Sequence, residues 1–523
     1  IDNIAQRSRI VMEGVTDDTY QTHIYNADPT ADRTITLPDQ TGTAMLWQSP
    51  WPDDPASRNL AIGALALEDL TSTASGNTAV GEEASQHVTT GGWNTAVGYR
   101  ANSRNATGTH NTAVGTNSMW SLQGSSTTGS SYNTSLGSNA LSYSTQSKDY
   151  NVGIGYFAMD DFASDYAVAV GARSMSDGSH YQSVAVGYDA LGRSSTSYPY
   201  YNVAIGYNAG NGIYSGDHNV VIGYNSDTAY NNHSYATTLG SNATAGTSSV
   251  SVGYQAGYSQ DSSSAYNVLL GQHAGYDLDG GDYCSFIGYQ SGYNGGSGSN
   301  NDGVGYRSLY SLSSGIQNVA FGSVAGFNIN TGSGNVCVGY NAGNGVISGN
   351  SSTFLGTNAG KSQDNDVTNR LTTGSNVTCI GHDSIPTSGT ATNEITLGDN
   401  DITSLRCNVQ TISSLSDERD KTAIEDLPYG LDFINDMRPV KFTWNRRDGS
   451  FGARPDMGFI AQELAEVEAD HSSTSRTRLV NWENPSKLEA DYARSYPILV
   501  KAVQELSAKC DALEARLATL EGA

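Results

Sequence analysis

Residues 202–209 have the sequence NVAIGYNA, and variants of this stretch recur along most of the chain. We count 20 copies, each centred on a glycine, and successive glycines are most often 17 residues apart. An internal period of this length is typical of a solenoid, in which each repeat forms one rung that stacks on the next. The 20 glycines are Gly63, Gly81, Gly98, Gly115, Gly137, Gly155, Gly171, Gly187, Gly206, Gly223, Gly240, Gly253, Gly271, Gly288, Gly305, Gly322, Gly339, Gly356, Gly381 and Gly398.

The residues around each glycine predict a short strand followed by a tight corner. Counted from the glycine, position −1 is aliphatic or Phe in all 20 copies, and position −3 is Thr, Val or Ile in 17. Because side chains alternate along a strand, these two positions share one face, which we predict to be buried. Position +3 is Ala or Ser in 19 copies, which indicates a corner without room for a larger side chain. Position −4 is Asn in 12 copies, which favours a turn bonded to backbone or to the next Asn.

The polar segment that leads from one repeat to the next varies in length. Two long examples are LQGSSTTGSSYN at 122–133 and KSQDNDVTNRLTTGSN at 361–376, and we expect such inserts to be exposed loops. A rung that buries two aliphatic side chains has too little apolar surface to offset its own ordering entropy. Rungs must therefore stack, and chains are expected to share a core. At about 4.8 Å per rung, the stack would form a rod of roughly 100 Å.

This repeat resembles the head repeats of trimeric autotransporter adhesins, which form a left-handed parallel β-roll built from three chains. The resemblance covers residues 59–401, although NNDGVG at 300–305 and YCSFIG at 283–288 depart from the pattern. It implies that the shaft is threefold. The predicted fold class is therefore mostly β, a trimeric parallel β-roll or β-solenoid shaft.

Composition excludes several kinds of site along the shaft. The net charge is −25, and the first 415 residues hold only 13 of the 27 Lys and Arg against 32 acidic residues. This balance argues against nucleic-acid binding and favours a solvated acidic surface. The DLDGGD segment at 277–282 has the Asp spacing of a calcium loop but lacks its twelfth-position Glu, so a turn is favoured.

The cysteines and the hydrophobicity pattern indicate in which cellular compartment the protein is made. Five scattered cysteines without a CxxC pair predict neither a disulfide framework nor zinc, and we expect them to be reduced, small apolar fillers. No run of about 18 apolar residues occurs, and IDNIAQRSRIVMEG has no signal-peptide pattern. We expect no metal, no cofactor, no membrane insertion and synthesis in a reducing cytoplasm. The cysteines are Cys284, Cys337, Cys379, Cys407 and Cys510.

A second composition begins near Leu415, where the repeats end. Residues 416–523 include SDERDKTAIEDLPYG, then DMGFIAQELAEV, and finally a helical pattern at about 498–521. The apolar residues of that last segment alternate spacings of four and three, which is typical of a supercoiled bundle. Such a seam predicts a coiled coil formed with other copies of the chain, with a single helix packed on its own domain as the alternative. The seam residues are Leu499, Val503, Leu506, Cys510, Leu513, Leu517 and Leu520.

Residues 416–523 closely resemble the intramolecular chaperone domain found at the C-termini of endosialidase-type tailspikes, phage fibres and some membrane-bound transcription factors. The matching segments are SDERDK at 416–421, RPV at 438–440 and GFIAQEL at 458–464. In that family the domain trimerises, holds three chains in register while the β-shaft folds, and then cuts itself off through a Ser–Lys dyad. The resemblance implies that residues 416–523 form an α+β chaperone domain ending in a trimeric coiled-coil helix. It also implies that Ser416 and Lys421 are catalytic here and that the cut lies between Leu415 and Ser416.

The implied chemistry is reasonable for these residue types. Serine is a weak nucleophile, and a lysine amine can serve as its base only when burial or nearby charge keeps it partly neutral. Ser416 Oγ would attack the carbonyl of Leu415, and water would hydrolyse the resulting ester. Without the resemblance, SDERDK would be interpreted as an N-cap serine before a charged first turn.

The N-terminal residues and the tyrosines carry weaker signals. RTITLPDQTGTAML at 33–46 resembles a segment near the starts of phage fibre shafts, so residues 1–58 are predicted to be a connector and 402–415 a linker to the cleavage point.

Nine motif glycines are followed by Tyr, which we expect to stack as shaft packing, with sugar binding as the alternative. These are Tyr99, Tyr156, Tyr188, Tyr207, Tyr224, Tyr254, Tyr289, Tyr306 and Tyr340.

Together these patterns predict a phage tail fibre or tailspike subunit. Its expected partners are two more copies of itself, a host cell-surface glycan or receptor, and other phage tail proteins, and its expected location is the virion tail after assembly in the host cytoplasm. The only expected enzymatic activity is self-processing. A polysaccharide depolymerase tailspike and a bacterial trimeric adhesin are the rival hypotheses, but no carboxylate pair can be placed for glycan hydrolysis and no membrane anchor is found.

Overall fold

The computed structural model describes residues 9–13, 21–25, 58–71, 73–120, 129–143, 148–160, 164–176, 180–193, 199–361, 373–399, 401–402, 404–406, 408, 416–445, 454–471, 478–482 and 488–522. Within the N-terminal unit, Ile1–Trp47, strands β1 (Arg9–Glu13) and β2 (Gln21–Tyr25) pair antiparallel. The RTITLPDQTGTAML segment, both long inserts, Cys407 and Leu415 lie wholly or largely outside the described residues.

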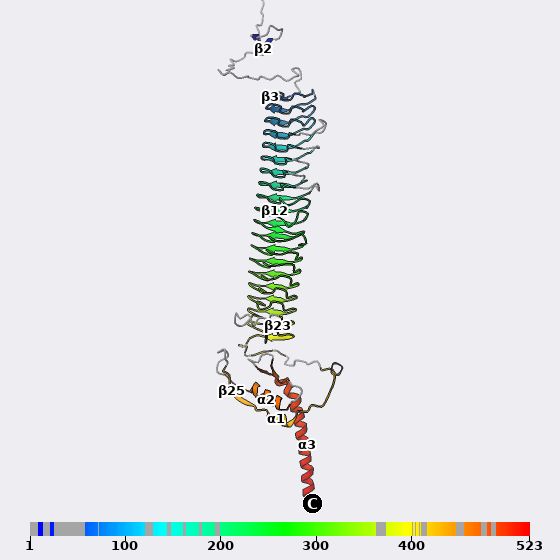
Figure 1. The fold of residues 1–523 in the computed structure, drawn as a ribbon, viewed down its shortest axis with the longest axis vertical. Coiled ribbons are helices and arrows are strands. Elements are labelled where there is room, and N and C mark those ends of the chain that lie inside the picture. Colours follow the sequence, from blue (N-terminus) through cyan, green and yellow to red (C-terminus); the bar gives the residue numbers. More distant parts are fainter. Residues whose placement is uncertain are drawn as a thin grey trace, which may run out of the picture. The chain divides into compact units, whose positions relative to one another are not determined.

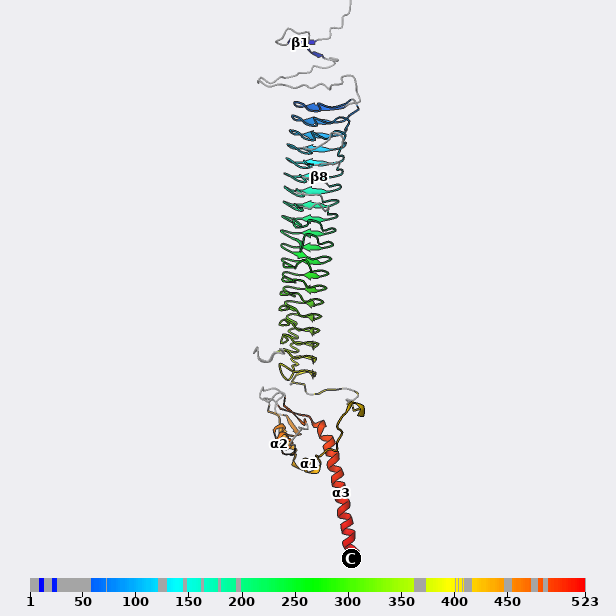
Figure 2. The same cartoon turned by 45° about the vertical axis from the view of Figure 1, so that its right-hand side comes forward.

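The repeats form one parallel β-solenoid, in which each rung contributes a short strand to a continuous ladder (Figure 1; Figure 2). Neighbouring strands pair residue by residue, as in Leu60↔Thr78, Ala61↔Ala79 and Ile62↔Val80. The predicted parallel solenoid is confirmed. Its strands are β3 (Leu60–Ile62), β4 (Thr78–Val80), β5 (Thr95–Val97), β6 (Thr112–Val114), β7 (Thr134–Leu136), β8 (Val152–Ile154), β9 (Val168–Val170), β10 (Val184–Val186), β11 (Val203–Ile205), β12 (Val220–Ile222), β14 (Thr237–Leu239), β16 (Val250–Val252), β17 (Val268–Leu270), β18 (Ser285–Ile287), β19 (Asp302–Val304), β20 (Val319–Phe321), β21 (Val336–Val338), β22 (Thr353–Leu355), β23 (Val377–Ile380) and β24 (Glu394–Leu397). A second short ladder joins β13 (Asp227–Thr228) to β15 (Thr244–Ala245).

The prediction of which strand face is buried within one chain was wrong. In β3 the middle residue, Ala61, is buried, whereas Leu60 and Ile62 on either side are exposed. The same pattern recurs along the ladder, because position −2 points into the rung and positions −3 and −1 point out of it. The interior of a rung is narrow, which explains why Ala, Ser and Gly are common at position −2.

The motif glycine is required by its backbone and by its neighbours. Gly81 has φ +132°, and a Cβ there would lie 2.6 Å from the carbonyl oxygen of Gly98 in the next rung. Its amide donates to the Ile62 carbonyl of the preceding rung at 2.7 Å. Side-chain-bearing residues rarely adopt this conformation, so glycine alone allows both the turn and the close stacking.

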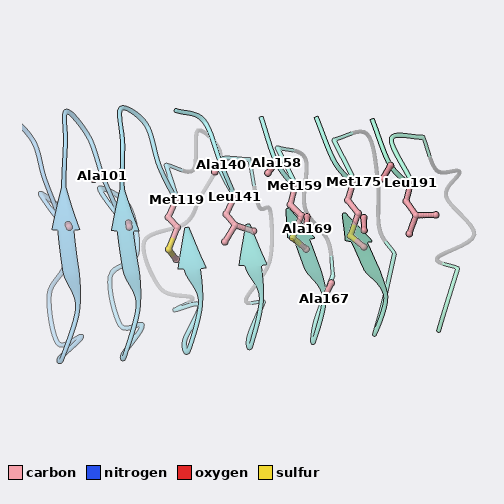
Figure 3. Close-up of a cluster of buried hydrophobic side chains, with 14 of the residues drawn as sticks. Ala101, Met119, Ala140, Leu141, Ala158, Met159, Ala167, Ala169, Met175 and Leu191 are labelled. Carbon is pink, nitrogen blue, oxygen red and sulfur yellow. The ribbon is translucent and has the colours of Figure 1, made fainter. Parts of the chain in front are cut away.

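The Ala or Ser at position +3 is buried, as predicted, and the residue after it fills the interior. In one run of rungs position −2 is small and the residue at +4 is large, as in the column of Met119, Leu141, Met159, Met175 and Leu191 (Figure 3). Where position −2 is large, the residue at +4 is glycine. A Cβ on Gly292 would lie 2.4 Å from the Phe286 ring. In these rungs the two positions compensate each other in volume. In the rungs of Ala204 and Ala320 both positions are small, and Ile213 or Ile329 lies beside the glycine instead.

The Asn at position −4 forms the predicted ladder between rungs. Asn77 Oδ1 accepts from both the backbone N–H and the Nδ2 of Asn94 at 3.0 Å, and Asn94 Nδ2 also donates to the Gly108 carbonyl at 2.9 Å. Asn94 in turn accepts from Asn111 in the same way. These bonds satisfy buried backbone groups that the short strands leave unpaired.

Residues 416–522 form a small α+β region with its own core. The core contains Phe433, Met437, Leu464, Val480 and Ile498. Its elements are the 3₁₀ turn η2 (Glu418–Asp420), α1 (Leu431–Asp436), β25 (Val440–Thr443) paired antiparallel with β26 (Pro455–Gly458), α2 (Ala461–His471), β27 (Val480–Asn481) paired antiparallel with β28 (Glu489–Ala490), the 3₁₀ turn η3 (Tyr492–Arg494), and α3 (Ser495–Glu521). Among the described residues, no helix has both the length and the apolar character needed to cross a membrane.

Candidate self-cleavage site and assembly surfaces

The structure brings Ser416 and Lys421 into direct contact. Lys421 Nζ donates to Ser416 Oγ at 2.7 Å and to the Ser416 carbonyl at 3.2 Å. The turn η2 between them bends the chain back, so that five residues of separation become a side-chain contact. Both residues are exposed in the single chain. A neutral amine at this distance could accept the hydroxyl proton during attack on a carbonyl.

Asp417, rather than Ser416, caps the turn η2. Its Oδ1 accepts from the Arg419 backbone N–H at 2.9 Å, and the Arg419 guanidinium clamps the same carboxylate with Nη2 2.6 Å from Oδ2. The Arg419 hydrogen bonds lower the pKa of Asp417. The alternative that Ser416 is an N-cap is therefore wrong, and its hydroxyl is left for Lys421.

The motif residues downstream of the turn position the rest of this region. The Arg438 guanidinium pairs with the Glu463 carboxylate, with Nε 2.9 Å from Oε2, which joins β25 to α2. Hydrogen bonding to Arg438 lowers the pKa of Glu463. Gly458 is held against Tyr492, because a Cβ there would lie 2.7 Å from the phenol oxygen. Leu464 enters the core. The segments RPV and GFIAQEL thus meet in the fold.

The predicted coiled-coil seam lies on α3, and almost all of it is uncovered in the single chain. Near the start of the helix, Ile498 and Ala502 are buried against the rest of the region. The predicted helix is confirmed, but its association with other helices is untested. The seam residues lie on the exposed side of α3: Leu499, Val503, Leu506, Cys510, Leu513, Leu517 and Leu520.

A second uncovered apolar surface runs along the shaft. It consists of the outward-pointing residues at positions −3 and −1, which we call the aliphatic strip. Strands aligned residue by residue place these side chains above one another, as in Val203↔Val220 and Ile205↔Ile222. Position −1 is aliphatic or Phe in every rung, and an exposed apolar line of this length marks an interaction site. Its most exposed members include Leu60, Ile62, Val97, Leu136, Ile205, Val220, Leu239, Ile287, Val319, Phe321, Val336, Leu355 and Ile380.

The tyrosines at position +1 stack on one another where consecutive rungs carry them. Ring centroids are 5.2 Å apart for Tyr188 and Tyr207, 5.4 Å for Tyr207 and Tyr224, and 5.5 Å for Tyr289 and Tyr306. Neighbouring rings cover each other's faces, which favours the packing interpretation at these rungs.

Two further aromatic columns were missed by the sequence analysis. One occupies position −5, and the other, at position +5, runs through Tyr258, Tyr276, Tyr293, Tyr310 and Phe327 with centroids 4.9–5.2 Å apart. Counting aromatic residues at each offset from the motif glycine would have found both.

The buried cysteine thiols are part of the apolar core of the shaft. Cys284, Cys337 and Cys379 are free and buried, as expected for apolar fillers, and burial raises the pKa of Cys337 to about 12. Cys510 is exposed on α3. Within the part of the chain that the structure describes, no group of three or more His, Cys, Asp or Glu is arranged to hold a metal ion.

Comparison with known families finds one match, to the peptidase S74 model described as the chaperone of endosialidase, over residues 416–472. The match starts at Ser416 and contains Lys421, Arg438 and Glu463. No curated protein matches the chain, and no solved structure matches it. The chain therefore combines a β-solenoid shaft with a C-terminal segment similar to the endosialidase chaperone.

Proposed function

We propose that this chain is a subunit of a phage tail fibre or tailspike that recognises the host surface through its shaft. Its C-terminal region assembles three chains and then cuts itself off between Leu415 and Ser416. The observation that carries the proposal is the contact between Ser416 and Lys421 at the start of the segment that is similar to the endosialidase chaperone. This segment begins just after a solenoid, where a folding aid that is later removed would be placed.

Assembly supports the proposal through two separate apolar surfaces. The aliphatic strip leaves each shaft with an uncovered face, and the seam of α3 leaves the helix with another. Burying a Leu or Val side chain contributes about 1.5–3 kcal/mol, so covering either surface with other copies would be strongly favourable. Three copies are proposed because both family resemblances are to trimers.

Cleavage should depend on assembly, because Ser416 and Lys421 are exposed in the single chain. An ordinary lysine amine is protonated at neutral pH and cannot accept a proton from serine. A neighbouring chain that covered the pair would exclude water and favour the neutral amine. After the cut, the separated chaperone could no longer assist refolding, so the shaft would be stable for kinetic reasons.

Mass spectrometry of the full chain and its variants tests the cleavage. Wild type should yield a fragment ending at Leu415, whereas Ser416→Ala and Lys421→Ala should each leave the chain uncut. Lys441→Ala removes another exposed lysine of the same region and should cut normally. Cleavage that persisted in Ser416→Ala would eliminate the mechanism.

A further inference from the structure

The aromatic column at position −5 runs along the shaft with nearly parallel rings. Centroid separations are 4.9 Å from His110 to Tyr132, 4.8 Å from Tyr132 to Tyr150, and 5.0 Å from Tyr150 to Tyr166. Farther along, His218 lies 5.0 Å from Tyr235. Inside these runs each ring face is covered by the next ring, so only ring edges and hydroxyl groups face solvent.

A single rung without a ring interrupts the column at Ser248. Its backbone continues the column, because Ser248 N–H donates to the Ser234 carbonyl and Tyr266 N–H donates to the Thr247 carbonyl, both at 3.0 Å. Ser248 therefore lies between Tyr235 in the preceding rung and Tyr266 in the following one. The ring contacts stop at Tyr235 and resume between Tyr266 and Tyr283.

The same arrangement occurs once more, at Gln182. Gln182 N–H donates to the Asp165 carbonyl at 3.0 Å and Tyr201 N–H to the Tyr181 carbonyl at 3.1 Å, so Gln182 separates Tyr166 from Tyr201. The side chains of Gln182 and Ser248 are themselves exposed.

Among the described residues, no ring contact links the two tyrosines that flank each interruption, Tyr166 with Tyr201 and Tyr235 with Tyr266. Two rung steps of about 4.8 Å separate the flanking rings by about 10 Å, which is the distance that one intervening ring occupies elsewhere in the column. The flanking tyrosines are 49% to 62% exposed, whereas Tyr132 and Tyr150 inside a run are 48% and 46% exposed.

We propose that each interruption binds one pyranose ring of an uncharged glycan, held between two tyrosine faces. The C–H faces of a pyranose are apolar and suit the electron-rich faces of aromatic rings, while its hydroxyls need polar partners. Polar residues stand at the same rungs, Ser248 and its neighbour Thr247 in one and Gln182 in the other. The acidic surface of the shaft opposes binding of a charged uronic or sialic acid chain.

This inference rests on the proposed host-surface role and gives it a location and a ligand class. The two interruptions lie four rungs apart, or about 19 Å along the shaft. A polysaccharide that bound both would gain affinity from their linkage, and the other copies in an assembled shaft would add further pairs.

Filling the interruptions provides a test that does not depend on damaging the fold. Ser248→Tyr with Gln182→Tyr should complete the column, because Ser248 and Tyr235 already share a left-handed backbone, with φ 53° and 59°. The matched control is Gln317→Tyr, which adds a ring to the same column between Asn300 and Gly334, where no flanking ring exists.

Binding would be measured by calorimetry and saturation-transfer NMR on the assembled protein, with maltohexaose, cellohexaose and chitohexaose as uncharged probes and hexagalacturonate as the charged one. Wild type and Gln317→Tyr should bind at least one uncharged probe, and the double variant should bind it about tenfold more weakly or not at all. Failure of wild type to bind any uncharged probe, a preference for hexagalacturonate, or equal binding by the double variant would overturn the proposal.

Two further readouts separate this inference from the proposed function. If light scattering shows that only the double variant fails to assemble, side chains of another copy fill the interruptions and the sugar sites are wrong. Adhesion of the shaft to a panel of bacterial cells tests the host-surface role by itself. Adhesion that is undiminished in the double variant would contradict the sugar sites alone, whereas no adhesion by wild type would contradict the host-surface role.

Discussion

The shaft and the C-terminal region bury their apolar side chains in different ways. A shaft rung has a narrow interior of Ala, Ser and a few larger side chains, and its polar backbone is satisfied by ladders such as that of Asn77 and Asn94. The C-terminal region has an ordinary mixed core around Phe433 and Leu464. Both regions nevertheless leave a long apolar surface uncovered, along the strands in one and along α3 in the other.

This difference indicates how the two regions depend on each other. The rungs of the shaft present similar strand surfaces, so a chain shifted by one rung against another would find nearly the same contacts. The C-terminal region has unique contacts, such as the Leu431 N–H that donates to Glu505 Oε2 on α3 at 2.8 Å. A region with unique contacts can fix register for a repetitive one, which is a physical reason for a separate assembly module.

The largest expected effect comes from charging the seam of α3. Leu506→Asp with Leu513→Asp should abolish assembly, because carboxylates in a seam between helices would lose water without gaining partners. The protease-resistant shaft should disappear with it, although no shaft residue has changed. Light scattering and limited proteolysis would check both effects.

Two controls sharpen this prediction. Ala508→Asp with Ala515→Asp places the same charges on the opposite side of α3 and should leave assembly intact. Cys510→Leu keeps the seam apolar and should preserve or raise its stability. A shaft that formed normally in the Leu506→Asp, Leu513→Asp variant would show that the shaft assembles without the helix.

A smaller, local effect is expected inside one rung. Gly292→Leu should overpack the interior against Phe286 and destabilise the shaft by about 3 kcal/mol or more. Adding Phe286→Ala should restore stability, because Ala185 and Leu191 already form such a pair in another rung. Rates of thermal inactivation would give the comparison.

The matched control for this rung is Gly210→Leu, where position −2 is Ala204. A Cβ on Gly210 would first meet the Leu191 side chain at 2.9 Å, whereas on Gly292 it meets the Phe286 ring at 2.4 Å. Gly210→Leu should therefore cost less. Equal losses at both sites would contradict the pairing of positions −2 and +4.

The smallest expected effect is a pH dependence near His180. This side chain is buried, and burial lowers its pKa to about 4. The neutral ring is favoured in the fold, so its stabilisation is complete above the unfolded pKa near 6.5 and is lost as pH falls towards 4. The loss at pH 5 should be about 2 kcal/mol.

A local measurement is needed, because burial raises the pKa of Asp227 to about 6. The stabilisation from protonated Asp227 is present at low pH and is lost as pH rises through 6. This pH dependence of stability is opposite in sign to that of His180. Hydrogen exchange of amides in the rungs around His180 should quicken from pH 7 to pH 5 in wild type and not in His180→Gln. Equal pH dependence in both proteins would remove His180 as the cause.

Much of the candidate site could be predicted from residues close in sequence. The contact between Ser416 and Lys421 needs only a turn across five residues, and the family resemblance pointed to both. The pairing of Arg438 with Glu463 could not be derived in this way, because it depends on how the segment between α1 and β25 lies against α2. The aromatic column at position −5 is visible in the sequence, because aromatic residues recur at that offset in consecutive repeats.

The sequence by itself determined the number of rungs, the place of the glycine turn and the Asn ladder, because each of these depends on local conformation or on a short period. Only the tertiary structure decided which side of each strand lies inside. A three-residue strand alternates its faces in the same way whichever face is buried. The choice comes from the narrow rung interior, which accepts Ala61 and leaves Leu60 and Ile62 to be covered from outside the chain.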